Sequence, residues 1–523
     1  MRIWTGRAGS GKTTAILREI AALSEKGEGR QILLVPELNS HLMERRLAAA
    51  THNHGARTAE VLTFSRLADR VFSEVGGLAQ QMLTPAGQLL TLQEAARRVQ
   101  GGLSAWKGLA DKPELLQEAL RLIDECKTCA VAPETLFAAA EESEDAVLAE
   151  KLSDLAQILT AYERLCEESL PDPRDRLTHL RDRLAESHTL DGAAVYLDGF
   201  LGFTVQESAV VDAMLAAGVP LSAAVTCDTD YPEIFLTGCK TVQRLTRMAK
   251  HHNQMVERIE LGESKVARPA GLAALERESL LPVRTPQESA DGVRLYEAAS
   301  PFDECEHAAA YIRRKVRDEG ARCRDFVVAA RDIEPYSAFL AMAMARYDIP
   351  VFLAEKPDLL SRPPMALVTN ALEAVRNHFR YEDLFSCLKT GLAGLDWDEI
   401  DKLENYVLTW NIRGGAWERE WTEHPDGYGL SIDENAKAQL AELNTLRKRA
   451  IAPFSALREA LAGEQPAGDC VRALYAFLLA VDAPQRMTDR AAGHEQAGRL
   501  QLADEYRQLW EILVSAMEQF AWV

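Results

Sequence analysis

The chain has 523 residues, of which 47% are hydrophobic and 26% are charged. This globular composition excludes a disordered, collagen-like or fibrous protein. The 59 Lys and Arg residues against 79 Asp and Glu residues leave a net charge of −20, which excludes a surface that is basic everywhere but not a local basic groove for nucleic acid. At roughly 100–200 residues per domain, the length predicts about three or four domains.

The first part of the chain alternates short apolar strands with amphipathic helices, which is typical of a parallel α/β sheet. We expect strands at 2–5, 31–35 and 59–63, and helices at 13–23 and 64–74. After a long helical stretch the same pattern returns, with strands at 194–198 and 221–226 and a helix at 206–217. The fold class predicted is therefore α/β with a helical insertion.

A second α/β unit follows a polar, proline-containing segment, and the rest of the chain is again mostly helical. In this second unit we expect strands at 293–296, 326–330 and 351–353 and a helix at 304–317. The predicted domain limits are 1–83 and 191–266 for the two parts of the first α/β domain, 84–190 for its helical insertion, 267–292 for a linker, 293–363 for a partial second α/β domain and 364–523 for a second helical insertion.

The cysteines indicate the cellular compartment. There are nine, scattered along the chain, and they do not form the pattern of a disulfide framework. Cys126 and Cys129 have the spacing of a redox or zinc site, but no second pair or nearby histidine completes one, so we interpret them as structural. No apolar signal segment follows Met1 and no apolar run is long enough to cross a membrane. We therefore expect a cytoplasmic protein.

The end of the chain has an unusual pattern. An amphipathic helical pattern continues to Val523 without a cap. This pattern predicts a chain cut inside a larger protein.

A glycine-rich pattern lies between the first predicted strand and the first predicted helix. It reads Gly6-Arg7-Ala8-Gly9-Ser10-Gly11-Lys12-Thr13 and fits G-x-x-x-x-G-K-[ST]. In this pattern the backbone N–H groups and the helix N-terminus bind phosphate, Lys12 reaches the β- and γ-phosphates, and the Thr13 hydroxyl ligates Mg²⁺. The eight residues predict a binding site for ATP and Mg²⁺.

An acidic residue at a second strand end is the candidate partner of this loop. Asp198 ends the strand at 194–198 and is predicted to hold Mg²⁺; the alternative is a turn residue before Gly199. DNA-translocating motors commonly carry a glutamate, acting as the base, where this chain has Gly199, so general-base catalysis is missing there. Arg331, at the end of the strand at 326–330, is a candidate for the γ-phosphate, or else an ordinary exposed arginine.

Candidate DNA-binding residues follow the third predicted strand. Phe64 and Arg66 suit base stacking and phosphate contact, whereas the alternative is a core phenylalanine and a surface arginine.

Beyond the glycine-rich loop, a series of short segments resembles the AddB family, the B subunits of AddAB-type helicase–nucleases. In chain order they are Leu34-Val35-Pro36-Glu37, Thr63-Phe64-Ser65-Arg66-Leu67-Ala68, Leu197-Asp198-Gly199-Phe200, Phe203-Thr204-Val205-Gln206-Glu207, Tyr381-Glu382-Asp383-Leu384-Phe385, Leu388-Lys389-Thr390-Gly391-Leu392, Leu403-Glu404-Asn405-Tyr406-Val407 and Ile412-Arg413-Gly414. Their order over residues 1 to about 420 carries the resemblance.

The resemblance implies a superfamily 1 helicase-like fold with two RecA-like units, each with a helical insertion, and a degenerate motor. It implies an AddA-like partner that carries the working motor, a role in double-strand break resection for recombination, and contact with single- and double-stranded DNA. Phe203 joins Phe64 and Arg66 as a candidate DNA-binding residue. A nuclease domain with an iron–sulfur cluster would follow beyond Val523.

Three positions depart from the family pattern. Leu38 and Ser40 stand where the family usually has Gln and Thr, and Asp69 stands where an aromatic residue is common. The resemblance assigns these positions to the surface that reads Chi, a short regulatory DNA sequence. Leu38 cannot form the bidentate hydrogen bond of an amide to a base, and Asp69 cannot stack. We therefore expect Chi recognition to be altered or lost.

Two other function classes remain open from the sequence. One is an autonomous P-loop NTPase or kinase with a helical insertion, for which the second α/β unit and Arg331 would be superfluous. The other is a scaffold whose P-loop is vestigial, which a protein without nucleotide binding would favour.

Overall fold

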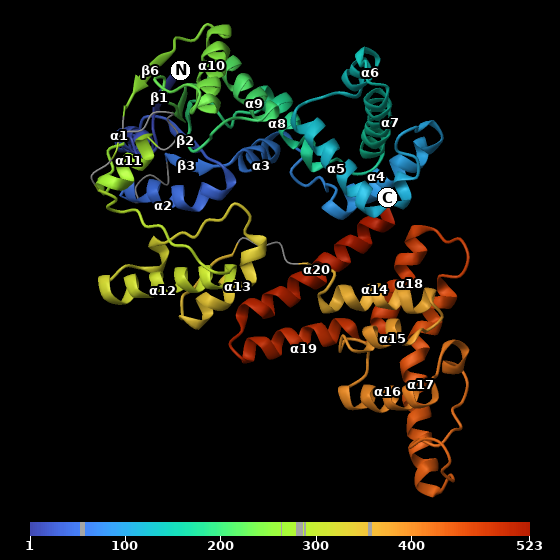
Figure 1. Cartoon of the computed structure of the whole chain (residues 1–523). Coiled ribbons are helices and arrows are strands. Elements are labelled where there is room, and N and C mark those ends of the chain that lie inside the picture. The colour runs from blue at the N-terminus through green and yellow to red at the C-terminus, as the bar shows by residue number, and fades with distance from the viewer. Residues whose placement is uncertain (53–57, 263, 279–285, 287–288, 354–357, 523) are drawn as a thin grey trace. The chain divides into compact units, whose positions relative to one another are not determined.

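The computed structural model describes residues 1–52, 58–262, 264–278, 286, 289–353 and 358–522. The chain divides into two compact units (Figure 1). The first unit comprises residues 1–267, 455–480 and 484–523, and the second comprises residues 268–454 and 481–483.

The first unit contains a six-stranded sheet with the strand order β3-β2-β4-β5-β1-β6. All neighbouring strands are parallel. The strands are β1 (Arg2–Gly6), β2 (Arg30–Leu34), β3 (Ala59–Leu62), β4 (Ala193–Leu197), β5 (Leu221–Thr226) and β6 (Glu257–Glu260). The predicted α/β class and the five strands predicted for this part are confirmed, and β6 is an additional edge strand. In a parallel sheet the carboxyl ends of all strands lie at one edge.

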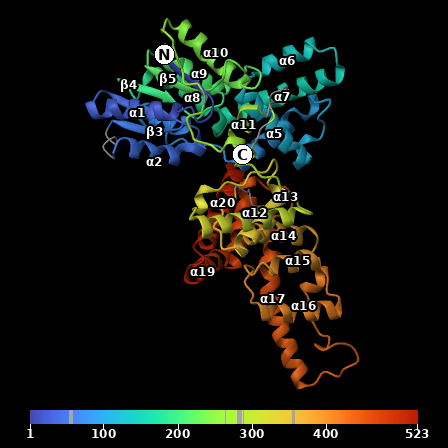
Figure 2. The same ribbon diagram turned by 60° about the vertical axis from the view of Figure 1, so that its left-hand side comes forward.

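Helices cover both faces of this sheet (Figures 1 and 2). Alternate residues of each strand enter different cores, so Ile3 packs with α3, α9 and α10, whereas Trp4 packs with α1 and α2. Coverage of both faces explains why the inner strands are mostly apolar, whereas the edge strand β6 (Glu257–Glu260) is mostly exposed. The helices around the sheet are α1 (Lys12–Lys26), α2 (Ser40–Ala50), α3 (Phe64–Val75), α9 (Val205–Ala216) and α10 (Leu236–His251).

The stretch between β3 and β4 is helical, as predicted, and has a core of its own around Leu92, Ile123 and Ile158. The helices of this core are α4 (Pro85–Val99), α5 (Pro113–Thr128), α6 (Pro133–Glu142) and α7 (Ala146–Glu168). Helix α8 (Arg176–Arg183) follows them and packs through Leu180 into the core of the sheet. The buried carboxylate of Asp154 accepts backbone N–H groups from residues 104–106 at 2.8–3.1 Å, which fixes the turn after α4.

The second unit is helical in its described residues. Its helices are α11 (Ala270–Glu278), α12 (Pro301–Glu319), α13 (Glu334–Arg346), α14 (Pro363–Arg376), α15 (Tyr381–Leu388), α16 (Trp397–Trp410) and most of α17 (Glu434–Ala460). Helix α11 falls in the predicted linker, part of which lies outside the described residues.

The strands expected at 293–296, 326–330 and 351–353 are not strands in the structure. A strand exists only where a neighbour supplies ladder hydrogen bonds, and the described residues pair none of these apolar segments. A second parallel sheet therefore stays a prediction, and the predicted domain limits stay predictions as well.

The last helices are α18 (Ala467–Ala480), α19 (Ala483–Gln496) and α20 (Leu500–Trp522). Among the described residues, no helix combines the length and the apolar character that crossing a membrane requires.

Helix α20 is joined to the start of α4 through Gln519. Its Oε1 accepts hydrogen bonds from the Thr84 backbone N–H at 2.8 Å and the Thr84 hydroxyl at 2.7 Å, and its Nε2 donates to the Met82 carbonyl at 3.1 Å. A Cβ on Gly87 would lie 1.9 Å from Gln519 Oε1. Glycine at position 87 therefore makes room for this contact.

We expect Gly87→Ala to lower the free energy of unfolding by about 1–3 kcal/mol, because the methyl group displaces the Gln519 amide and leaves buried polar groups without partners. In a Gln519→Ala background the same change should be neutral or stabilising, because alanine is the better helix former. Urea unfolding of the four variants measures the coupling. Equal effects of Gly87→Ala in both backgrounds would contradict the steric explanation.

Candidate nucleotide-binding site

The predicted phosphate loop joins the carboxyl end of β1 to the N-terminus of α1. Gly9 and Gly11 have φ values of +79° and +98°, a conformation that residues with a Cβ rarely adopt. Gly11 is the N-cap of α1, and its cap makes no side-chain hydrogen bond. The first backbone N–H groups of α1 are thus left for another acceptor, as phosphate binding at a helix N-terminus requires. Ala8 is exposed at the tip of the loop.

Lys12 lies within the loop rather than in solvent. It is 9% exposed, and its Nζ donates to the carbonyl oxygens of Gly6 at 2.8 Å and Arg7 at 2.9 Å. Burial lowers the pKa of the Lys12 ammonium, and the nearby carboxylate of Asp198 acts in the opposite direction. The two carbonyl oxygens therefore keep the ammonium of Lys12 at the loop. They are neutral acceptors, so an anionic phosphate can replace them.

Asp198 directly follows β4, which is joined to β1 through β5. Its side chain is 4% exposed, and burial raises the pKa of its carboxyl group. Hydrogen bonding from the Thr13 side chain and the Gly199 backbone, together with the charges of Lys12 and Arg46, opposes that rise. The predicted Mg²⁺ residues Thr13 and Asp198 are thus in contact although 185 positions separate them in the chain (198 − 13).

Two buried oxygens at this site remain without partners. Within the described part of the chain, Oδ2 of Asp198 and Oγ of Ser10 make no hydrogen bond, although Ser10 is 0% exposed. Buried polar atoms are nearly always satisfied, so an unpaired carboxylate oxygen beside a threonine hydroxyl indicates a missing partner. Mg²⁺ takes carboxylate and hydroxyl oxygens together with phosphate oxygens. Thr13 and Asp198 fit such an ion by the chemistry of their oxygens.

Gly199 has a φ value of +85°. A Cβ at this position would lie 3.1 Å from Nδ2 of Asn39 and 3.3 Å from Cδ of Pro36. A glutamate would meet both a strained backbone and a crowded space. The backbone and the neighbours of Gly199 therefore disfavour the glutamate that a translocating motor carries at this position.

The side chain of Arg7 is engaged with the chain that follows β5. Its guanidinium forms an ion pair with Asp228 at 2.5 Å and lies 5.0 Å from the ring centre of Tyr231 and 5.8 Å from that of Phe235. Arg7 therefore attaches the loop to the chain that follows β5. The sequence pattern groups Arg7 with the ligand residues, but its side chain has this anchoring contact instead.

A segment that the sequence did not indicate also contacts the loop. After β6 the chain crosses the loop: Arg7 N–H donates to the Gly262 carbonyl at 3.4 Å, and Lys265 N–H donates to the Gly9 carbonyl at 2.9 Å. Lys265 Cδ lies 3.9 Å from the position of a Cβ on Gly11. Lys265 could not be found by motif, because it lies 252 positions beyond Thr13 in a polar stretch without a pattern (265 − 13).

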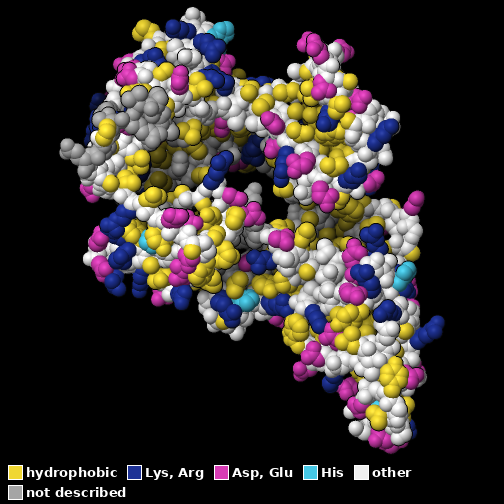
Figure 3. Space-filling model, in the orientation of Figure 1, with side chains coloured by type: hydrophobic (Ala, Val, Ile, Leu, Met, Phe, Trp, Pro, Cys, Tyr) yellow, Lys and Arg dark blue, Asp and Glu magenta, His cyan; other side chains and the backbone are white. Residues whose placement is uncertain are grey.

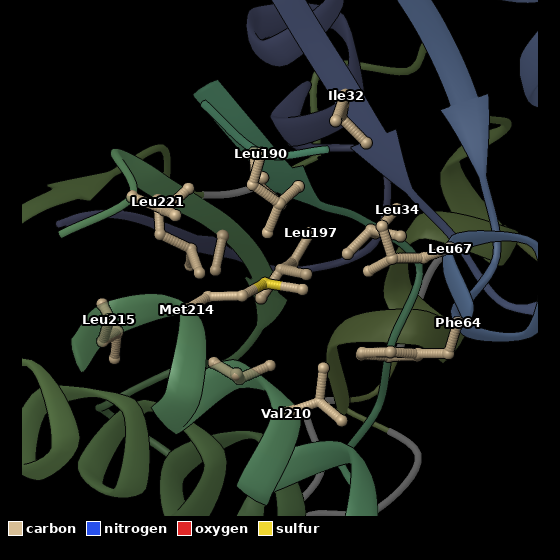
Figure 4. Close-up of a cluster of buried hydrophobic side chains, with 14 of the residues drawn as sticks. Ile32, Leu34, Phe64, Leu67, Leu190, Leu197, Val210, Met214, Leu215 and Leu221 are labelled. Carbon is tan, nitrogen blue, oxygen red and sulfur yellow. The ribbon is translucent and has the colours of Figure 1, made fainter. Parts of the chain in front are cut away.

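The candidate DNA-binding residues differ in exposure. Phe64 is 6% exposed and packs edge-on against Phe200, with ring centres 5.6 Å apart. Figure 4 shows its ring among core side chains, between Leu67 and Val210. Phe203 is partly buried against the same core. This geometry matches the alternative in which Phe64 is a core residue.

Arg66 is exposed and forms an ion pair with Glu44 at 2.6 Å. Leu38 is 98% exposed, whereas Asp69 pairs with Arg176. These contacts leave Arg66 accessible to a phosphate, while Asp69 is already engaged within the protein.

The remaining predicted residues lie elsewhere. Arg331 is exposed in the second unit, where it lines a cavity of about 540 Å³ with Glu304 and Tyr336. It does not belong to the unit that contains the phosphate loop, so its contact with a γ-phosphate stays a prediction. Cys126 is buried and Cys129 is exposed, and the described residues bring no three His, Cys, Asp or Glu side chains together as metal ligands.

Comparison with known proteins identifies the family. The family model described as "ADDB, N-terminal" matches residues 3–276, which is just over half of the chain. The chain belongs to the AddB family. The family match includes the phosphate loop, Asp198 and Lys265 and extends to the first helix of the second unit.

Curated relatives agree with this AddB assignment. The chain is 32% identical to the B subunit of the ATP-dependent helicase/deoxyribonuclease of Acetivibrio thermocellus and 32% identical to the protein of the same name from Desulforamulus reducens. It is 30% identical to that of Thermoanaerobacter sp. strain X514. Each match covers 99% of the chain but only 46–47% of the relative, so the chain spans about half the length of these relatives.

We expect Asp198→Asn to stabilise the nucleotide-free protein. A carboxyl whose pKa is raised above its ordinary 3.8 costs stability as pH rises from 3.8 through the folded-state value, because the unfolded chain releases the proton first. The amide has no charge to bury. The gain in free energy of unfolding should therefore be larger at pH 8 than at pH 4.5, as urea titrations at both values would measure. A gain that shrinks with rising pH would contradict a buried, strained carboxylate.

We expect Phe64→Ala to lower the free energy of unfolding by roughly 3–5 kcal/mol, the usual loss for a buried phenylalanine. Arg66→Ala should change it by less than about 1 kcal/mol, because the pair with Glu44 is exposed. Binding of Phe64→Leu and Arg66→Ala to single-stranded DNA, measured by fluorescence anisotropy, separates the roles. Weakening by Arg66→Ala alone would assign the contact to the arginine, whereas equal weakening by Phe64→Leu would show that the ring leaves the core to stack.

Proposed function

We propose that the chain is the ATP-binding, helicase-like half of one subunit of a DNA helicase–nuclease that acts in double-strand break resection and recombinational repair. The observation that carries this proposal is the group formed by Lys12, Thr13 and Asp198 at the carboxyl edge of a parallel sheet, with unpaired buried oxygens on Ser10 and Asp198. Membership of the AddB family supports the DNA-directed part, because the relatives named above are B subunits of an ATP-dependent helicase/deoxyribonuclease by name.

Each residue of the group has a defined task when ATP binds. The backbone N–H groups of Gly11 and Lys12 donate to the phosphate oxygens, whereas the Ser10 N–H bonds to the Arg7 carbonyl at 3.2 Å. Lys12 exchanges its carbonyl partners for the β- and γ-phosphates. Thr13 and Asp198 would hold Mg²⁺, which would offset phosphate charge at this place. Binding of this kind satisfies both unpaired oxygens of the site.

The proposed motor is degenerate. ATP hydrolysis needs a group that orients or deprotonates the attacking water. Gly199 occupies the position where a translocating motor has that base, and the backbone there disfavours a side chain. We propose that ATP is bound and is turned over slowly or not at all. In this proposal nucleotide binding controls the conformation of the chain and does not drive translocation along DNA.

Partners and the remaining cofactor follow from the same assignment. The name of the relatives describes one subunit of a complex, which supports an AddA-like partner that supplies the working motor.

Single- and double-stranded DNA are the proposed polymer ligands. Figure 3 shows basic and acidic side chains interspersed on the face in view, so DNA contact would be local rather than spread over the surface. The iron–sulfur cluster and the nuclease activity are assigned to the part of the relatives that this chain does not cover.

The alternative of an autonomous P-loop NTPase or kinase receives less support. The chain matches a helicase/deoxyribonuclease subunit over 99% of its own length. An unrelated kinase gives no reason for such a match. Rapid turnover without DNA would favour it.

Lys12→Ala tests the proposal. We expect it to abolish ATP binding, because the buried ammonium is the main cation that meets the phosphates. The fold should persist, because among the described residues the hydrogen bonds of Lys12 go to its own loop. Isothermal titration calorimetry with Mg²⁺-ATP measures the affinity, and phosphate release with and without single-stranded DNA measures turnover.

Lys26→Ala, at the other end of α1, is the matched control, because it removes the same charge from an exposed position. Unchanged ATP affinity of Lys12→Ala would reject the nucleotide site. Brisk DNA-stimulated turnover by the unaltered chain would reject the degenerate motor.

A further inference from the structure

The chain between β6 and the second unit is attached directly to the phosphate loop. Leu261 N–H donates to the Thr5 carbonyl at 2.9 Å and so prolongs the pairing of β6 with β1. The bonds from Arg7 to Gly262 and from Lys265 to Gly9 then hold the next residues on the loop itself. Three backbone bonds over five residues leave little freedom in where residue 265 can lie.

Lys265 is held in this way beside the N-terminus of α1. Its backbone N–H bonds to Gly9, and its side-chain Cδ lies 3.9 Å from the position that a Cβ would occupy on Gly11. From Cδ only two further bonds lead to the ammonium group. The ammonium therefore lies within reach of an anion bound at the α1 N-terminus.

The other cations of the loop do not by themselves balance the negative charge of a bound nucleotide. Arg7 is neutralised by Asp228, and Lys12 is the buried cation of the loop. In the part of the chain that the structure describes, Lys265 has no ion-pair partner and remains exposed. ATP carries several negative charges, which a single lysine and one Mg²⁺ do not fully offset.

The unpaired Oγ of Ser10, fully buried between Gly9 and Gly11, independently indicates a ligand at this place. A hydroxyl can donate to a phosphate oxygen. The two observations arise from different elements, one from the loop and one from the segment after β6.

We propose that Lys265 is a second cationic ligand for the phosphate chain of the nucleotide. This inference rests on the proposed nucleotide site and adds to it a residue from the segment that leads into the second unit. Phosphate binding then holds Lys265 through its side chain as well as through its backbone. The nucleotide thereby acts on the start of the connection at Ala267 and Arg268.

Calorimetry on the full chain with Mg²⁺-ATP and Mg²⁺-ADP tests the inference. We expect Lys265→Gln to weaken ATP binding by about tenfold, the loss that accompanies removal of one charge-assisted hydrogen bond. ADP binding should weaken less, because ADP presents less charge. Lys265→Arg should retain most of the affinity, and the ATP affinity of Lys265→Gln should depend less on salt than that of the unaltered chain.

Lys26→Gln is the control for a general effect of charge. It removes one lysine from α1, and at 1.5 Å per residue it lies about 21 Å along the helix from Lys12. ATP affinity that is equal in Lys265→Gln and the unaltered chain would overturn the inference, and so would equal losses in Lys265→Gln and Lys26→Gln. If Lys12→Ala still abolishes binding in that case, the proposed function survives; if Lys12→Ala also binds normally, the nucleotide site itself fails.

Discussion

The parallel pairing of β1, β5 and β4 is the constraint on which the candidate site depends. Because neighbouring strands run in the same direction, the phosphate loop after β1 and Asp198 after β4 emerge at one edge of the sheet. The strands are buried on both faces, so a shift in register would move apolar side chains out of both cores. The position of Asp198 relative to Thr13 is therefore as firmly determined as the core itself.

The site holds buried polar groups within a well-packed frame, and two of their oxygens, Ser10 Oγ and Asp198 Oδ2, have no hydrogen-bond partner among the described residues. A lysine held by carbonyl oxygens, a carboxylate whose pKa is raised by burial and a buried serine hydroxyl all cost stability when no ligand is present. A phosphate chain with Mg²⁺ would satisfy these groups together. Such an arrangement is typical of a binding site, where part of the folding stability is given up for affinity.

The loop is also connected outward on two sides. Arg7 attaches it to the chain after β5 through Asp228 and two aromatic rings, and backbone bonds to Gly262 and Lys265 attach it to the chain after β6. If the proposed nucleotide site is occupied, these contacts relate binding to segments beyond the sheet without any need for hydrolysis. Under that proposal, a protein with Gly199 in place of the base would respond to ATP through binding alone.

Local sequence was enough to predict five of the six strands of the first sheet and the glycine-rich loop between β1 and α1. Strand periodicity, the glycine-rich pattern and the series of short family-like segments can each be recognised from residues that lie close together in the chain. The first α/β unit, its helical insertion and the AddB resemblance were therefore predictable. A second sheet was also predicted, but its segments are not strands among the described residues. The apolar segments 326–330 and 351–353 become strands only with a pairing strand, which the described residues do not provide. The burial of Phe64, the anchoring of Arg7 and the approach of Lys265 to Gly11 depend on the folded chain as a whole. Each is a contact between segments far apart in the chain, and no local pattern records such a contact.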